Sequence, residues 1–206
     1  MAITFPLSFP TLRGVANITW RAVRADMQTS SPLTFAQQVI KHQGQRWEAD
    51  VVLPPMERAE AKEFISFCLR LDGRTGTFLF SPPAEELPSG ALGGSPLVAG
   101  AGQTGSELNI DGLTFSVTDW MKGGDFFQLW TGAASRLHMV TQDVSSDGAG
   151  LATLDIWPNL RESPTDNLAI TTSSPTGVFR MESPTTDWSI DEMTNYGLAF
   201  GIVEAL

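Results

Sequence analysis

The stretch "QRWEADVVLPPMERAEAKEFISFCLRLDG", residues 45–73, decides the fold because it joins a strand directly to a helix. Its first part alternates between polar and apolar side chains, which is the pattern of a half-buried strand. The apolar face of this strand holds Trp47, Ala49, Val51 and Leu53, and the polar face holds Arg46, Glu48 and Asp50. Pro54-Pro55 then end the strand, because proline cannot donate a hydrogen bond to a sheet ladder.

Residues 56–72, which follow the two prolines, have the spacing of an amphipathic helix. The apolar stripe of the helix consists of Ala61, Phe64, Ile65, Cys68 and Leu71. Gly73 is a suitable residue for the C-terminal stop. We therefore expect Phe64 and Ile65 to be buried between this helix and a sheet.

The segment before the opening stretch predicts further strands. Residues 16–28 alternate, and a slip of the phase near Ala22–Val23 indicates a bulge or a bend. After the turn-forming "SSPLT" we predict a strand, a tight turn around His42–Gln45, and then the strand that ends at the two prolines. On this interpretation two short strands follow the loop.

The composition shifts at residue 82, and residues 82–112 are rich in glycine, proline, serine and alanine. Beyond them, turn-forming residues separate several short runs of strand-forming residues. These runs cover residues 125–130, 136–144, 151–158, 176–181 and 188–190, and a last strand follows near the C-terminus. Many short strands, one helix and no strand–helix–strand succession predict a mostly β, antiparallel architecture.

Three glycines, Gly100, Gly102 and Gly105, match the G-x-G-x-x-G spacing of a dinucleotide-binding loop. In that motif a helix leaves the loop, and the N-terminus of the helix receives the pyrophosphate. Here "SELNIDG" follows, which is typical of a strand and a turn. We therefore interpret the glycines as a connection into the second half of the chain, and we predict no nucleotide cofactor.

Neither a catalytic motif nor a metal-binding motif is recognisable. The two histidines, His42 and His138, have no partner histidine or cysteine at metal-ligand spacing, and no G-x-S-x-G elbow is present. The single cysteine, Cys68, lies on the apolar stripe of the helix, where a small buried side chain is expected. We predict no catalytic residue, no cofactor, no metal site and no enzymatic activity.

The net charge of −10 argues against a nucleic-acid-binding face, because such a face needs basic side chains to replace counterions. Acidity keeps a protein soluble, and it also keeps a surface from adhering to a passing polyanion. No run approaches 18 uninterrupted apolar residues, so no membrane-spanning helix is predicted.

The order of these pieces resembles that of one known family. The strand "QRWEADVVLPPM" runs into the helix, and the glycine-rich "GSPLVAGAGQTGSELNIDG" follows it. Then come "MKGGDFFQLW" and "RLHMVTQDVSSDGAGLATLDIWPNLRESP", and the chain closes on "FGIVEAL". Over nearly the whole chain this succession resembles the distal tail proteins and related minor tail proteins of long-tailed bacteriophages.

The resemblance implies a split antiparallel β-barrel or sandwich made of residues 1–87 and 182–206, with a small β-barrel inserted at residues 88–181. It also implies that the glycine connection is the entry into this inserted domain. It also implies a homo-hexameric ring at the distal end of the tail tube, which connects the tube protein to the hub of the tail tip or baseplate. The ring would leave a channel for DNA without binding DNA specifically. The protein would assemble in the host cytoplasm and be part of the virion, at the tail tip, with no insertion into a membrane.

If such a channel exists, a role follows for the polar face of the strand in residues 45–53. If residues 17–53 line the lumen, Arg46, Glu48 and Asp50 would point into it. These three side chains are acidic on balance, so the wall would let DNA slide. In a monomer the same side chains would face bulk solvent.

A carbohydrate-binding β module for attachment to the host surface is an alternative function. It requires a cluster of exposed aromatic side chains on the inserted domain. The candidates for contact with a glycan are Trp120, Trp130 and Trp157. The alternative interpretation of these tryptophans is that they belong to the core.

Overall fold

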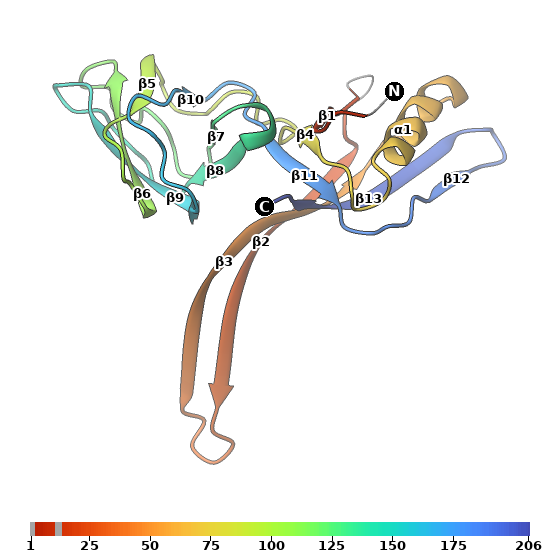
Figure 1. Cartoon of the computed structure of the whole chain (residues 1–206), viewed down its shortest axis with the longest axis horizontal. Coiled ribbons are helices and arrows are strands. Elements are labelled where there is room, and N and C mark those ends of the chain that lie inside the picture. The colour runs from red at the N-terminus through yellow and green to blue at the C-terminus, as the bar shows by residue number, and fades with distance from the viewer. Residues whose placement is uncertain (1–2, 11–13) are drawn as a thin grey trace.

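The computed structural model describes residues 3–10 and 14–206 (Figure 1). It is mostly β, with 45% of the described residues in strands or isolated β-bridges, which confirms the predicted fold class. The described part of the chain contains one α-helix and one short 3-10 helix at Gly132–Ala134. The other elements are β1 (Leu7–Ser8), β2 (Asn17–Ser30), β3 (Gln37–Val52), α1 (Arg58–Arg70), β4 (Phe78–Phe80), β5 (Gly94–Val98), β6 (Gly105–Leu113), β7 (Phe126–Leu129), β8 (Arg136–Val140), β9 (Ala152–Leu160), β10 (Ile170–Thr171), β11 (Gly177–Met181), β12 (Trp188–Ile190) and β13 (Tyr196–Glu204).

The strands form two sheets, which Figure 1 shows next to each other. The seven-stranded sheet has the order β1-β4-β11-β13-β3-β2, and β12 pairs with β13. The six-stranded sheet has the order β10-β7-β8-β9-β6-β5 and is nearly closed into a barrel. A bridge between Leu97 and Ala169 joins its two ends. All registered pairs of both sheets are antiparallel apart from β1 with β4.

The alternation predicted for β3 is confirmed. The apolar side chains of its inner face are all buried in the core that α1 covers, and they are Trp47, Ala49, Val51 and Leu53. The first three belong to β3 itself, and the fourth follows the last residue of this strand.

The helix α1 buries a stripe that differs from the predicted one at a single turn. Phe64 is fully buried, as expected, but Ile65 is only half-buried. Phe67 is buried instead, with its ring centroid 5.6 Å from that of Phe9 and 5.4 Å from that of Phe78. Contacts with Phe9 and Phe78 therefore orient α1 so that Phe67, and not Ile65, faces the core.

One long hairpin, and not two short ones, precedes the helix. β2 and β3 pair from Asn17 opposite Val52 to Ser30 opposite Gln37. The connection between them covers residues 31–36, where the turn-forming "SSPLT" lies. The hairpin is thus formed by the strand of residues 16–28 together with everything predicted as two later strands.

The tight turn predicted around His42–Gln45 is wrong, because β3 continues through it. Arg24 pairs with Gln45 and Asp26 pairs with Lys41, so one residue of β2 lies opposite three residues of β3. This irregularity is the bulge that the phase slip indicated, placed a few residues beyond Ala22–Val23. Gly44 suits it, since a Cβ atom there would come within 3.0 Å of the Cβ atom of Ala25.

The chain leaves the seven-stranded sheet after β4 and returns to it at β11. Phe80 and Gly177 are paired residues of these strands, so residues 81–176 form an excursion with both ends at one place. The division implied by the resemblance assigns residues 176–181 to the inserted barrel, which is wrong. Phe179 explains the difference, because its side chain is buried in the first core with its ring centroid 6.0 Å from that of Phe80.

The glycine connection lies inside the six-stranded sheet, between β5 and β6, and not at the entry to it. A strand follows it, as predicted, so the structure offers no helix N-terminus for a pyrophosphate. Gly100, Gly102 and Gly105 have φ values of +86°, +83° and +87°. Glycine is favoured there because a Cβ atom strains this backbone conformation.

Candidate functional site

The most prominent feature is the hairpin that leaves the body of the protein. β13 pairs with β3 only between Glu48 and Val52, and beyond that point β2 and β3 pair with each other alone. Every residue from Arg24 to Gly44 except Ser31 is exposed. We call residues 24–44 the arm, and Figure 1 shows it extending away from both sheets. The arm is the candidate interaction surface of this protein.

The surface of the arm is uncharged over most of its length and exposes several large apolar side chains. The segment from Met27 to Ile40 contains no charged residue. Its exposed large apolar side chains are Met27, Leu33, Phe35, Val39 and Ile40, of which Leu33 is 90% and Phe35 80% exposed. An isolated two-stranded hairpin is marginally stable at best, and free strand edges readily pair with other chains. The arm is therefore a surface that a partner chain would cover.

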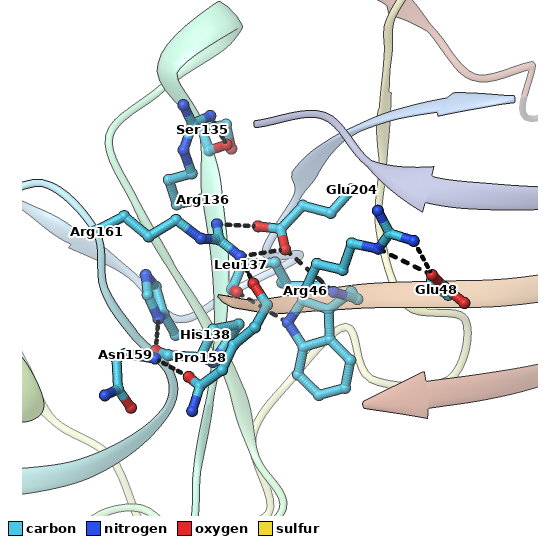
Figure 2. A network of polar contacts seen from close by, with 12 residues as sticks. Arg46, Glu48, Ser135, Arg136, Leu137, His138, Pro158, Asn159, Arg161 and Glu204 are labelled. Carbon is cyan, nitrogen blue, oxygen red and sulfur yellow. Dashed lines mark hydrogen bonds and ion pairs between the residues drawn. The ribbon is translucent and has the colours of Figure 1, made fainter. Parts of the chain in front are cut away.

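A cluster of ion pairs lies at the base of the arm. Arg46 donates from Nε and Nη2 to Oε1 of Glu48, at 2.9 and 2.6 Å (Figure 2). Arg21 of β2 donates to both carboxylate oxygens of Asp50, and its Nη2 lies 3.0 Å from Oδ1. The guanidinium of Arg21 also lies 3.7 Å from Glu48 and 3.8 Å from Glu182. Arg46, Glu48 and Asp50 thus share a face, as predicted, and Arg21 joins them.

Arg21 adds a second arginine to this face. With it, two arginines stand against three carboxylates, those of Glu48, Asp50 and Glu182, so the cluster remains acidic on balance. The hydrogen bond from Arg21 lowers the pKa of Asp50, and the same bond raises the pKa of Arg21. The pairing of β2 with β3 places Arg21 opposite Glu48. The turn wrongly predicted within β3 concealed this pairing from the sequence analysis. Whether this face lines a channel stays a prediction.

A partly buried polar network next to the cluster joins the two sheets (Figure 2). Glu204 of β13 accepts hydrogen bonds from Nη1 and Nη2 of Arg161, both at 2.7 Å, and from the backbone N–H of Trp47 at 3.1 Å. Arg161 also donates to the carbonyl of Gln45 at 2.5 Å, and Trp47 Nε1 donates to the carbonyl of Leu137 at 3.0 Å. The base of the arm is therefore tied to the barrel as well as to its own sheet.

His138, one of the two histidines without a metal-ligand partner in the sequence, is a structural residue of the same junction. Its Nδ1 lies 2.8 Å from the carbonyl of Pro158, and its ring stacks on Phe127 with the centroids 5.5 Å apart. Burial lowers the pKa of His138 to about 4, and the positive charges of Arg161 and Arg136 act in the same direction. The imidazole is therefore neutral at pH 7, and Nδ1 donates its hydrogen to the carbonyl.

The three tryptophans considered for glycan contact do not form one exposed cluster. Trp120 is 1% exposed in the barrel core, where its Nε1 donates to the carbonyl of Gly93 at 2.9 Å, so it is not available for contact. Trp130 is half-buried and packs against the same core. Trp157 packs against the other core, with its ring centroid 4.3 Å from that of Trp47. The aromatic platform that the carbohydrate alternative requires is thus missing from these positions.

Other chemistry finds little support in the described residues. Cys68 is buried, as predicted, and burial raises the pKa of its thiol to about 11. Within residues 3–10 and 14–206, no group of three or more His, Cys, Asp or Glu side chains is placed to hold a metal ion. Over the same ranges, no helix has the length and apolar character needed to cross a membrane.

Comparison with known proteins adds no assignment. No protein-family model matches the sequence, and no curated protein sequence matches it. The functional argument therefore depends on the arm and on its base.

Proposed function

We propose that this chain is a structural protein of a bacteriophage tail. Copies of it form a ring, of six as the resemblance implies, at the distal end of the tail tube. The ring connects the tube protein to the hub of the tail tip or baseplate, and it leaves a channel through which DNA passes. The observation that carries this proposal is the arm, an exposed hairpin whose apolar surface a single chain leaves uncovered.

The arm supports assembly because of what it exposes. Large apolar side chains such as Leu33 and Phe35 cost free energy in water, and a partner that covers them recovers it. The backbone edges of the arm are also unpaired within the described chain, so they are able to extend a sheet between molecules. Both features are explained when neighbouring copies pack around the arm.

The charge distribution supports a channel that does not hold DNA. A DNA-binding wall needs unpaired basic side chains, because affinity comes from the replacement of counterions. At the base of the arm Arg21 and Arg46 are occupied by Glu48 and Asp50. Such a wall, whose arginines are paired with carboxylates, gives passing DNA no strong site.

Native mass spectrometry at micromolar concentration, combined with the protein composition of purified phage particles, tests the proposal. We expect closed oligomers in the spectrum and the chain among the particle proteins. A strictly monomeric chain that is absent from the particles would overturn the proposal. Binding of that monomer to host-surface glycans on an array would instead favour the carbohydrate module.

A pair of matched variants shows whether the arm is responsible. The double change Leu33→Ser and Phe35→Ser should abolish the oligomer, because both side chains are exposed and so contribute little to the folding of one chain. The control is Leu87→Ser with Phe115→Ser, two side chains of the excursion that are each 67% exposed. The control should assemble as the unchanged protein does. Equal loss of assembly in both variants would show that the arm is not the contact surface.

A further inference from the structure

The net charge of the chain is distributed very unevenly. Residues 182–206 hold five acidic side chains and not one lysine or arginine. The arm, in contrast, holds Arg24 and Lys41 against Asp26, so it is positive on a protein whose total is −10. Arg24 and Lys41 are exposed, and neither forms an ion pair with another described residue.

Three of these five acidic residues lie on a second exposed hairpin, formed by β12 and the start of β13. We call residues 187–197 the acidic hairpin. Asp187 and Glu192 are exposed on it, and neither pairs with a cation of the described chain. Its exposed apolar side chains are Trp188, Ile190 and Met193. This hairpin therefore combines the same apolar character as the arm with the opposite charge.

Both hairpins also present open backbone edges. β2 is the last strand of the seven-stranded sheet, and β12 pairs with β13 and with no other described strand. Figure 1 shows the arm and the acidic hairpin pointing in different directions from the same sheet. Contact between them is therefore a contact between two molecules.

We propose that the arm of one copy docks on the acidic hairpin of the next copy. Arg24 and Lys41 would face Asp187 and Glu192, while the apolar side chains of the two hairpins cover each other. Opposite charges steer such an encounter and fix its register, and like charges oppose the alternative in which two arms meet. The contact joins two different surfaces, so it propagates from copy to copy and closes into a ring where the rotation permits. This inference rests on the self-assembly in the proposed function.

Charge reversal tests the contact in two variants of the full chain. The arm variant carries Arg24→Glu with Lys41→Glu. The hairpin variant carries Asp187→Lys with Glu192→Lys on the acidic hairpin. Each variant alone places like charges in the contact, so each should remain monomeric. Asp191 stays unchanged, because its carboxylate accepts hydrogen bonds from the backbone N–H groups of Met193 and Asn195 at 2.9 and 2.7 Å.

An equal mixture of the two variants is the decisive sample. The negative arm of the arm variant then meets the positive hairpin of the hairpin variant. The unchanged positive arm of the hairpin variant meets the unchanged acidic hairpin of the arm variant. The mixture should therefore assemble with the two chains in alternation. A control with Glu85→Lys and Glu107→Lys, two exposed carboxylates of the excursion, should assemble by itself. Native mass spectrometry distinguishes the compositions by mass.

The outcomes separate this inference from the proposed function. Recovery of oligomers in the mixture alone supports the docking. Folded variants that assemble singly, or whose mixture stays monomeric while the unchanged chain assembles, overturn the docking and leave the proposed function standing. An unchanged chain that never assembles overturns both. Recovery in the mixture by a chain that is absent from phage particles supports the docking and contradicts only the role in the tail.

Discussion

Phe80 of β4 and Gly177 of β11 are directly paired in the seven-stranded sheet, although the whole six-stranded sheet lies between them in the chain. The two ends of the excursion therefore already meet. The excursion still contributes to the first core, since Phe126 and Leu137 are buried in it. The excursion can thus be removed without a break in the strand order of the seven-stranded sheet, but its removal costs part of the stability of that sheet.

Replacement of residues 81–176 by a short Gly/Ser linker should leave a soluble chain with a folded seven-stranded sheet. Its melting temperature should fall, because Phe126 and Leu137 no longer cover Trp47. Circular dichroism with thermal unfolding measures both effects. The control replaces residues 90–182, which also removes β11 from between β4 and β13, and this chain should aggregate. Aggregation of both chains would contradict the separation.

The fold class and the helix follow from local periodicity, and the long hairpin does not. Alternation in β3 and the apolar stripe of α1 are determined by the buried face of each element, so one strand or helix suffices to show them. His42–Gln45 has turn-like composition, but in the structure these residues form a bulge inside one continuous strand. Only the pairing with β2 distinguishes the two possibilities, and pairing is a property of two segments.

Phe64→Ala should destabilise the protein by about 3–5 kcal/mol, the usual cost of removing a fully buried phenylalanine. Phe67→Ala should have a comparable effect, whereas Ile65→Ala should cost clearly less because Ile65 is only half-buried. Glu63→Ala, on the exposed side of α1, is the control and should change little. Thermal or denaturant unfolding measures the series. A larger loss for Ile65 than for Phe67 would contradict the observed orientation of the helix.

The candidate site was predictable only in part, because its charges come from different strands. The polar face of Arg46, Glu48 and Asp50 follows from alternation, and the structure keeps the three together. Arg21 pairs with Glu48 and Asp50 from across the hairpin, and Glu204 of the seven-stranded sheet meets Arg161, which follows the last residue of β9 in the six-stranded sheet. Sequence spacing contains no information on such partners until the sheet order is known.

Glu204→Gln should weaken the junction between the sheets. The change removes the charge that Arg161 faces at 2.7 Å, and the side chain of Glu204 is only 2% exposed. Loss of one partner of a buried pair costs about 3–5 kcal/mol, and we expect about 3 kcal/mol because Arg161 is partly exposed. Denaturant unfolding measures the loss. The reference is Glu182→Gln, an exposed carboxylate 3.8 Å from Arg21, which should cost less than about 1 kcal/mol. Equal costs would show that the network does not support the junction.

His138 makes stability depend on pH in a defined window. Burial lowers its pKa to about 4 in the folded protein, below the ordinary value of 6.5. The unfolded chain therefore binds the proton more readily. The stabilisation from neutral His138 is complete above pH 6.5, is lost as the pH falls from 6.5 to 4, and changes no further below that. Over this window the loss should reach about 3 kcal/mol, at 1.36 kcal/mol for each pKa unit.

His138→Gln separates this contribution from other acid effects. Glutamine can still donate to the carbonyl of Pro158 but takes up no proton, so the free energy of unfolding should change much less between pH 6.5 and 4. The comparison is of slopes, because the substitution also lowers stability at every pH. Asp50 and Asp147, whose pKa values lie below their ordinary range, act only at lower pH. A steep slope that persists in His138→Gln would place the sensitivity in another group.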